Sequence, residues 1–175
     1  MTISRQRFQH EEESPVAGTL LLAHPSMLDP NFHRTVVFLA ANDAKEGSLG
    51  LVMNRPMHTT LGEYDASAAD LPLANVPLFR GGPVATGQLV LAAWRWEEAG
   101  GTFQLYFGLD NAKAEKLLLE NKDFHVRGFM GHAGWSEGQL STEIHEGAWL
   151  LSRCLPELMH AEGEAVWRQM IRKEH

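Results

Sequence analysis

Cysteine is nearly absent from this 175-residue sequence, in which Cys154 is the single example. A lone cysteine excludes an internal disulfide and any zinc site built from several thiolates. Long apolar runs are absent too, because stretches such as Thr19–Ala23 and Leu89–Ala93 are far shorter than the roughly 20 residues of a membrane-spanning helix. The first residues are polar and turn acidic where a signal peptide would become apolar. We therefore expect a cytoplasmic protein that does not contact a membrane.

Positive charge is also scarce, with 15 lysine and arginine residues against 22 aspartates and glutamates, for a net charge of −7 with neutral histidine. Proteins that bind nucleic acid through its phosphates normally carry a basic patch. The densest basic cluster here, formed by Arg168, Arg172 and Lys173, has the pattern of a solvated helix face near a helix C-terminus, where cations are favoured. We expect no direct binding to nucleic acid.

The length and composition suit one globular domain with its own core. A chain of 175 residues falls within the roughly 100–200 residues typical of one domain, and 44% of its residues are hydrophobic. Residues 1–15 are largely polar, so we expect a mobile tail there. Residues 16–175 then form the single domain.

Short apolar runs bounded by turn residues recur along the chain and predict strands, several of them joined as hairpins. The clearest hairpin joins residues 88–96 to residues 102–107, and a second joins residues 35–40 to residues 49–53. Further strands are predicted at residues 18–23, 76–79, 124–130 and 148–152, and helices at residues 110–121, 139–146 and 164–171, with a short one after the capping box of Thr60 and Glu63. We therefore predict an α+β fold, in which three or four helices pack against a mixed, largely antiparallel curled β-sheet built from hairpins.

One segment, Gly134–Gly138 (GWSEG), fits the G-x-S-x-G pattern that presents a catalytic serine on a strand-to-helix turn. A catalytic Ser136 would need an acid and then a histidine from later strand ends. His145 lies within the helix that the turn begins, and no further βα unit remains around His160 to carry the partners of a triad. We therefore predict no catalytic serine, and we assign no other catalytic residue.

The same segment also fits a capping box, S-x-x-Q. In that arrangement the Ser136 hydroxyl accepts a hydrogen bond from the Gln139 N–H, while the Gln139 side chain accepts one from the Ser136 N–H. We favour this interpretation and expect a helix to start there. Upstream, Gly128, Gly131 and Gly134 recur every third residue, which permits close backbone approach either to a ligand or, more commonly, to a neighbouring strand.

Four blocks of sequence occur in a set order: GTLLLAHPSMLDPNFHRTVVFL, GSLGLVMNRP, LFRGGPV and GFMGHAGWSEGQLSTEIHEGAWL. Together they resemble the YqgE/AlgH family of small bacterial proteins, over about residues 18–149. Gly134, Trp135, Gly138 and Gln139 match the family pattern, whereas Ser136 falls at one of its variable positions. The resemblance implies an α+β fold and a soluble cytosolic protein, and some members of the family are labelled transcriptional regulators.

Three of the predicted strands end in turns that contain proline: His24-Pro25, Asn54-Arg55-Pro56 and Gly81-Gly82-Pro83. If these strand ends converge beside the helix after Ser136, they form a polar cleft in which Arg55 and the helix N-terminus favour an anion such as a carboxylate or phosphate. In the alternative, His24, Asp29 and Arg55 join the loops to one another by hydrogen bonds and an ion pair. The candidate ligand-binding residues are His24, Asp29, Asn54, Arg55, Gly81, Gly82, His132, Trp135 and Gln139.

Histidines near turns, among them His24, His33, His58 and His132, also raise the question of a metal site. No ligand motif such as H-E-x-x-H occurs, so we expect neither a metal nor a cofactor. Two functions remain open. The first is a non-enzymatic binding or regulatory protein that acts through a protein partner or a small anionic ligand. The second is a hydrolase or metal-dependent enzyme that uses the loops around His24 and His132.

Overall fold

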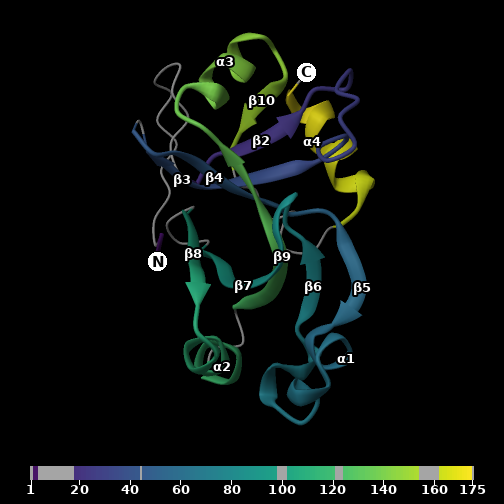
Figure 1. Ribbon diagram of the computed structural model, residues 1–175, viewed down its shortest axis with the longest axis vertical. Coiled ribbons are helices and arrows are strands. Elements are labelled where there is room, and N and C mark those ends of the chain that lie inside the picture. The colour runs from purple at the N-terminus through teal and green to yellow at the C-terminus, as the bar shows by residue number, and fades with distance from the viewer. Residues whose placement is uncertain are drawn as a thin grey trace.

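A long strand, β9 (His125–Trp135), connects the two halves of the sheet and explains most of the topology. The computed structural model describes residues 2–3, 18–43, 45–97, 102–120, 124–153 and 162–174. Within them, β9 pairs with β6 (Pro77–Arg80) and β7 (Val84–Glu97) mainly through its first part and with β4 (Gly47–Val52) through its last residues. Figure 1 shows β9 running from the lower half of the molecule to the upper half.

The remaining strands extend the sheet on both sides of β9. On one side, β7 pairs with β8 (Thr102–Leu109), which pairs in turn with β1 (Thr2–Ile3). On the other side the order is β4, β3 (Val36–Asp43), β2 (Leu20–Ala23) and β10 (Trp149–Ser152). These pairs are antiparallel, whereas β6 is parallel to β9 and pairs in antiparallel fashion with β5 (Pro56–Thr60). The sheet is mixed and largely antiparallel, as predicted.

Four α-helices pack around the sheet in the part of the chain that the structure describes, so the predicted α+β class is confirmed. Helices α1 (Leu61–Tyr64) and α2 (Asn111–Glu120) lie at the lower end of the view in Figure 1, and α3 (Gln139–His145) and α4 (Glu164–Glu174) at the upper end. Helix α4 joins the main core through four buried side chains: Val166, Trp167, Met170 and Ile171. Among the described helices, none combines the length and apolar character needed to cross a bilayer.

Most of the predicted elements are present, including both hairpins, β3–β4 and β7–β8. Strand β9 extends further than predicted, through Trp135, so the glycines before the helix lie within a strand. Strand β5 was not predicted, because a bulge and the left-handed backbone of His58 (φ 59°) interrupt its alternation. Thr2 and Ile3 form an edge strand beside β8, and the rest of the predicted tail, like Cys154 and His160, lies outside the described residues.

Close backbone packing between β9 and the turn before β7 explains the glycines at Gly81, Gly82 and Gly131. A Cβ atom on Gly81 would lie 2.2 Å from the carbonyl oxygen of Gly131, and one on Gly82 would lie 2.2 Å from the carbonyl carbon of His132. Gly131 itself has a φ of 83°, in the region that favours glycine. The backbone of the turn before β7 therefore contacts the backbone of β9 directly. Gly134 differs, because a Cβ atom there would meet no other atom within 4 Å.

A buried arginine, Arg127 of β9, helps to hold the strand end that carries the site. Its Nη1 donates to the carbonyl oxygen of Met53 at 3.0 Å, and its guanidinium lies over the rings of Phe79 and Trp94 at 4.1 and 4.9 Å. Burial lowers the pKa of Arg127 to about 10. The charge of Glu162 has the opposite, smaller effect and raises this pKa. The two ring contacts stabilise a cation that forms no ion pair with a described carboxylate.

Candidate functional site

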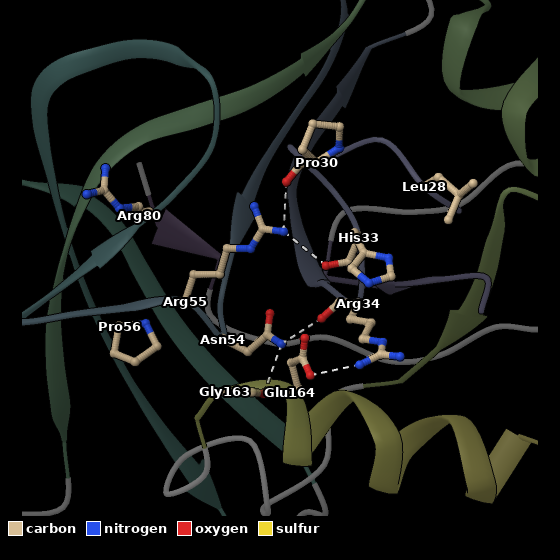
Figure 2. A pocket seen from close by; sticks show the side chains of 10 residues that line it. All are labelled: Leu28, Pro30, His33, Arg34, Asn54, Arg55, Pro56, Arg80, Gly163 and Glu164. Atoms are coloured by element: carbon tan, nitrogen blue, oxygen red, sulfur yellow. Dashed lines mark hydrogen bonds and ion pairs between the residues drawn. The ribbon is translucent and has the colours of Figure 1, made fainter. Parts of the chain in front are cut away.

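Asn54, two residues after the end of β4, connects three separate segments of the chain. Its side chain is 2% exposed, and its Oδ1 accepts a hydrogen bond from the Val36 N–H at 2.9 Å. Its Nδ2 donates to the carbonyl oxygens of Arg34 at 3.1 Å and Gly163 at 3.0 Å. Figure 2 shows these bonds converging on one side chain. Asn54 therefore fixes the start of β3 and the approach to α4 beside the same strand end.

Arg55 holds the loop between β2 and β3 in place. Its Nη1 donates to the carbonyl oxygen of Asn31 at 2.8 Å, and its Nη2 donates to those of Pro30 at 3.0 Å and His33 at 2.9 Å. Burial lowers the pKa of Arg55, while the charges of Asp29 and then Glu164 raise it. The guanidinium is thus held by neutral carbonyl groups and keeps a positive charge that no hydrogen-bonded carboxylate in the described chain neutralises.

Arg80, at the end of β6, lies next to Arg55 because β5 and β6 pair there. The Arg80 N–H donates to the carbonyl oxygen of Arg55 at 2.8 Å. The exposed Arg80 side chain has no hydrogen bond or ion pair with any described residue. Arg34 differs, because its Nη1 donates to Glu164 at 3.0 Å and its guanidinium lies 5.8 Å from the centre of the Trp167 ring. All three arginines line the pocket whose side chains Figure 2 draws.

These arginines line a depression with two lobes, which we call the Arg55–Arg80 groove because both residues border both lobes. The Glu164 lobe has a volume of about 600 Å³, and its other walls include Leu28, His33, Arg34, Asn54, Gly163 and Glu164. The Met130 lobe has a volume of about 440 Å³, and its other walls include Asn31, Val52, Met57, Tyr64, Thr86 and Met130. Both volumes fall within the roughly 300–1,000 Å³ of small-ligand sites.

Trp135 and Gln139 belong to a different cluster, built around Glu143 of α3. The indole N–H groups of Trp135 and Trp149 both donate to Glu143 Oε1, at 3.1 and 2.9 Å. The Gln139 amide donates to Glu143 Oε2 at 2.9 Å, and the Phe32 ring stacks against Trp135 with centroids 6.1 Å apart. This cluster ties α3 to β9 and β10. Neither Trp135 nor Gln139 lines the Arg55–Arg80 groove.

The two histidines of the candidate cleft lie in separate parts of the sheet. His24 follows β2 and accepts the N–H of Ser26 on its Nδ1 at 3.0 Å, within its own loop. His132 lies on β9, so strands β4 and β3 separate it from β2. Asp29 accepts a backbone N–H within its loop and acts on Arg55 through its charge. Of the nine candidate residues, the structure brings three to the groove, namely Asn54, Arg55 and Gly82.

The predicted capping box at Ser136 is only half correct. The Gln139 Oε1 does accept the Ser136 N–H at 3.0 Å, as predicted. The Ser136 hydroxyl, however, donates to the same Oε1 at 3.2 Å, and the Gln139 N–H bonds to the Ser136 carbonyl oxygen instead. Helix α3 begins after Gly138, whose φ of 78° shifts the cap two residues along the chain. The serine is neither a helix cap nor part of the groove.

Ser136→Ala is therefore expected to change the free energy of unfolding by less than about 0.5 kcal/mol. Gln139→Ala is expected to cost about 1 kcal/mol, because it removes both the acceptor of the Ser136 N–H and the donor to Glu143. Urea denaturation of the two variants, followed by tryptophan fluorescence, gives the comparison. A loss in Ser136→Ala as large as that in Gln139→Ala would contradict the hydrogen bonds described above.

Several residues of the groove were missed by sequence reasoning. Arg80 had one available signal, because it directly precedes the Gly81–Gly82 turn that was recognised. Tyr64 and Met130 lie next to patterns that were recognised, the Thr60–Glu63 capping box and the Gly128–Gly131 repeat, but neither pattern indicates that these two side chains line a groove. Across the described ranges, no three histidine, cysteine, aspartate or glutamate side chains form a group that could hold a metal ion.

With the fold and groove described, comparison with known proteins identifies the family. A model of the AlgH-like family matches residues 20–175, most of the chain. The chain belongs to the AlgH-like family. The resemblance carried by the four sequence blocks is thereby confirmed. A UPF0301 protein of Streptomyces coelicolor is 36% identical over 176 residues, covering 93% of this chain and 89% of that relative. A UPF0301 protein of Chlorobium luteolum is 33% identical, covering 94% and 89%.

Two solved structures share the fold. The crystal structure of a protein from Corynebacterium diphtheriae matches with a TM-score of 0.69 and 24% identity, covering 93% of this chain and 89% of that one. The solution structure of the AlgH protein from Pseudomonas aeruginosa matches with a TM-score of 0.66 and 23% identity, covering 96% and 94%. At these identities the likeness shows the AlgH-like fold alone.

Proposed function

We propose that the protein is a non-enzymatic binding protein that takes an anion in the Arg55–Arg80 groove, either a small molecule or an anionic group of a protein partner. Arg80 carries the proposal. It is an exposed guanidinium with no partner among the described residues, and it lines the same groove as Arg55, whose guanidinium three carbonyl oxygens hold in place. The planar donor fork of arginine matches carboxylate and phosphate oxygens.

Arg55 supports the same assignment through its electrostatics. Its pKa is lowered by burial, so the positive charge is incompletely compensated by Asp29 and Glu164. Because its guanidinium is already positioned by the loop, little side-chain entropy is lost when an anion binds beside it. An incoming anion would supply the missing negative charge. A regulatory role would then follow from occupancy of the groove by that ligand or partner.

Isothermal titration calorimetry with inorganic phosphate as the probe tests this proposal. We expect saturable binding to the full chain, weakened about tenfold by Arg80→Met, since a charge-assisted hydrogen bond is worth about 1.5 kcal/mol or more. Choline, a cation of similar size, is expected not to bind. Arg172→Met is the matched control, because it removes the same charge from an exposed position on α4, outside the groove.

Two outcomes would contradict the proposal. An equal loss of phosphate affinity in Arg80→Met and Arg172→Met would show that phosphate binding depends on the overall charge of the protein and not on the groove. Turnover of an ester or phosphoester that disappears in His24→Ala would establish an enzyme and remove the non-enzymatic assignment.

A further inference from the structure

The two lobes of the Arg55–Arg80 groove differ in whether a carboxylate lines them. The Glu164 lobe contains a carboxylate, which lies 3.0 Å from Arg34 and 4.0 Å from Arg168. Among the described residues that line the Met130 lobe, Arg55 and Arg80 are the only charged groups. Arg34 lines the same lobe as Glu164 and offsets its charge, so the two lobes do not differ in net charge. An anionic ligand that extends into the Met130 lobe meets no carboxylate there.

The lining of the Met130 lobe is partly polar and partly apolar. Val52 and Met130 are buried walls, Met57 is half-buried, and Tyr64 stands at the rim with 54% of its surface exposed. Methionine side chains adapt to the shape of an apolar group, and a tyrosine ring provides a large flat contact. At about 440 Å³, the lobe is far larger than an inorganic ion needs. A bare anion would leave this apolar surface uncovered.

We infer that the ligand is a small amphipathic anion, whose phosphate or carboxylate lies against Arg55 and Arg80 and whose apolar body fills the Met130 lobe. The inference rests on the proposed function, because the arginine pair must first bind the anionic group. In small-molecule sites a few polar contacts orient the ligand, and apolar walls add to the affinity. Arg55 and Arg80 set the orientation of the ligand, and contacts between its apolar body and the Met130 lobe determine which anions bind most tightly.

Calorimetric titration of the full chain with four probes separates the anionic group from the body. The probes are inorganic phosphate, phenyl phosphate, benzoate and phenol. We expect phenyl phosphate or benzoate to bind at least about tenfold more tightly than inorganic phosphate, because burial of a ring adds apolar contact. Phenol, which lacks the charge, is expected to bind more weakly than both. The tighter of the two ring-bearing anions shows whether the site prefers a phosphate or a carboxylate.

Two exposed residues provide matched variants, one in each lobe. Tyr64→Ala removes a side chain at the rim of the Met130 lobe. It is expected to weaken the binding of the ring-bearing anions about threefold and to leave the affinity for inorganic phosphate unchanged. Leu28→Ala removes an apolar side chain, 82% exposed, from the Glu164 lobe and is expected to change none of the affinities. Both side chains are exposed, so neither substitution should prevent folding.

The outcomes distinguish this inference from the proposal on which it rests. Equal affinities for inorganic phosphate and phenyl phosphate would contradict the inference that the ligand has an apolar body, without contradicting the proposed anion site. An effect of Tyr64→Ala no larger than that of Leu28→Ala would do the same. Phenyl phosphate binding that survives unchanged in Arg80→Met, or no binding by any probe, would overturn the anion site itself.

Discussion

Gly131→Ala is expected to lower the free energy of unfolding by about 3 to 4 kcal/mol, the largest effect of any substitution considered for this protein. Gly131 has a φ of 83°, a conformation that costs an alanine about 1 kcal/mol or more. The added Cβ would also lie 2.5 Å from the carbonyl oxygen of Gly82 and 3.0 Å from that of Val84. Both contacts are with backbone atoms, so relief requires β9 and β7 to move apart.

Gly134→Ala is the matched control on the same strand. A Cβ atom there meets nothing within 4 Å, and the exposed backbone has no left-handed φ, so we expect a change of less than about 0.5 kcal/mol. Urea denaturation of both variants gives the comparison, provided that the slopes of the transitions agree. Similar stabilities for the two variants would contradict the close packing of the Gly81–Gly82 turn on β9.

Asn54→Ala is expected to lower the free energy of unfolding by about 3 kcal/mol, because it leaves three backbone groups without partners. The Val36 N–H is wholly buried, and the carbonyl oxygens of Arg34 and Gly163 face the same side chain. Asn54→Asp is expected to be destabilising too, since a carboxylate keeps the acceptor for Val36 but has no N–H for the two carbonyl groups.

Hydrogen exchange and denaturation together check this second prediction. In Asn54→Ala the Val36 amide should lose protection, while Asn75→Ala, at an exposed position, should change stability by less than about 0.5 kcal/mol. A stability for Asn54→Ala equal to that of Asn75→Ala would show that the three hydrogen bonds contribute nothing net. The prediction also concerns the groove, because Asn54 and Gly163 both line the Glu164 lobe.

The local elements could be predicted because they depend on residues close together in sequence. The Thr60–Glu63 capping box forms as predicted, with reciprocal hydrogen bonds at the start of α1. The helix after the GWSEG segment ends just before Gly147, whose φ is 82°. In that segment, the order of residues predicts that the serine is not a nucleophile, and this stays a prediction. The exact hydrogen bonds of the serine could not be predicted, because Gly138 takes the cap position.

The candidate site could be predicted only in part. Asn54 and Arg55 were recognised from a polar turn at a strand end, and the structure places both at the groove. Trp135 and Gln139 were placed in the cleft because they flank a helix start, yet their polar atoms bond to Glu143. A buried indole N–H takes whichever acceptor the packing brings within reach, and sequence spacing does not show which one that is.

The sequence by itself determined the α+β class and the hairpins, since periodicity and turn residues report which faces are buried and where strands end. Its four ordered blocks determined the AlgH-like family. Only the tertiary structure decided which strand ends meet. Arg80 lies beside Arg55 because β6 runs parallel to β9 and pairs with β5, and Asn54 bonds to Gly163 across 109 residues of sequence. The apolar pattern of a strand shows that it is buried but not which strand it pairs with. That choice depends on packing between segments far apart in the chain, here on three glycines that let two backbones touch.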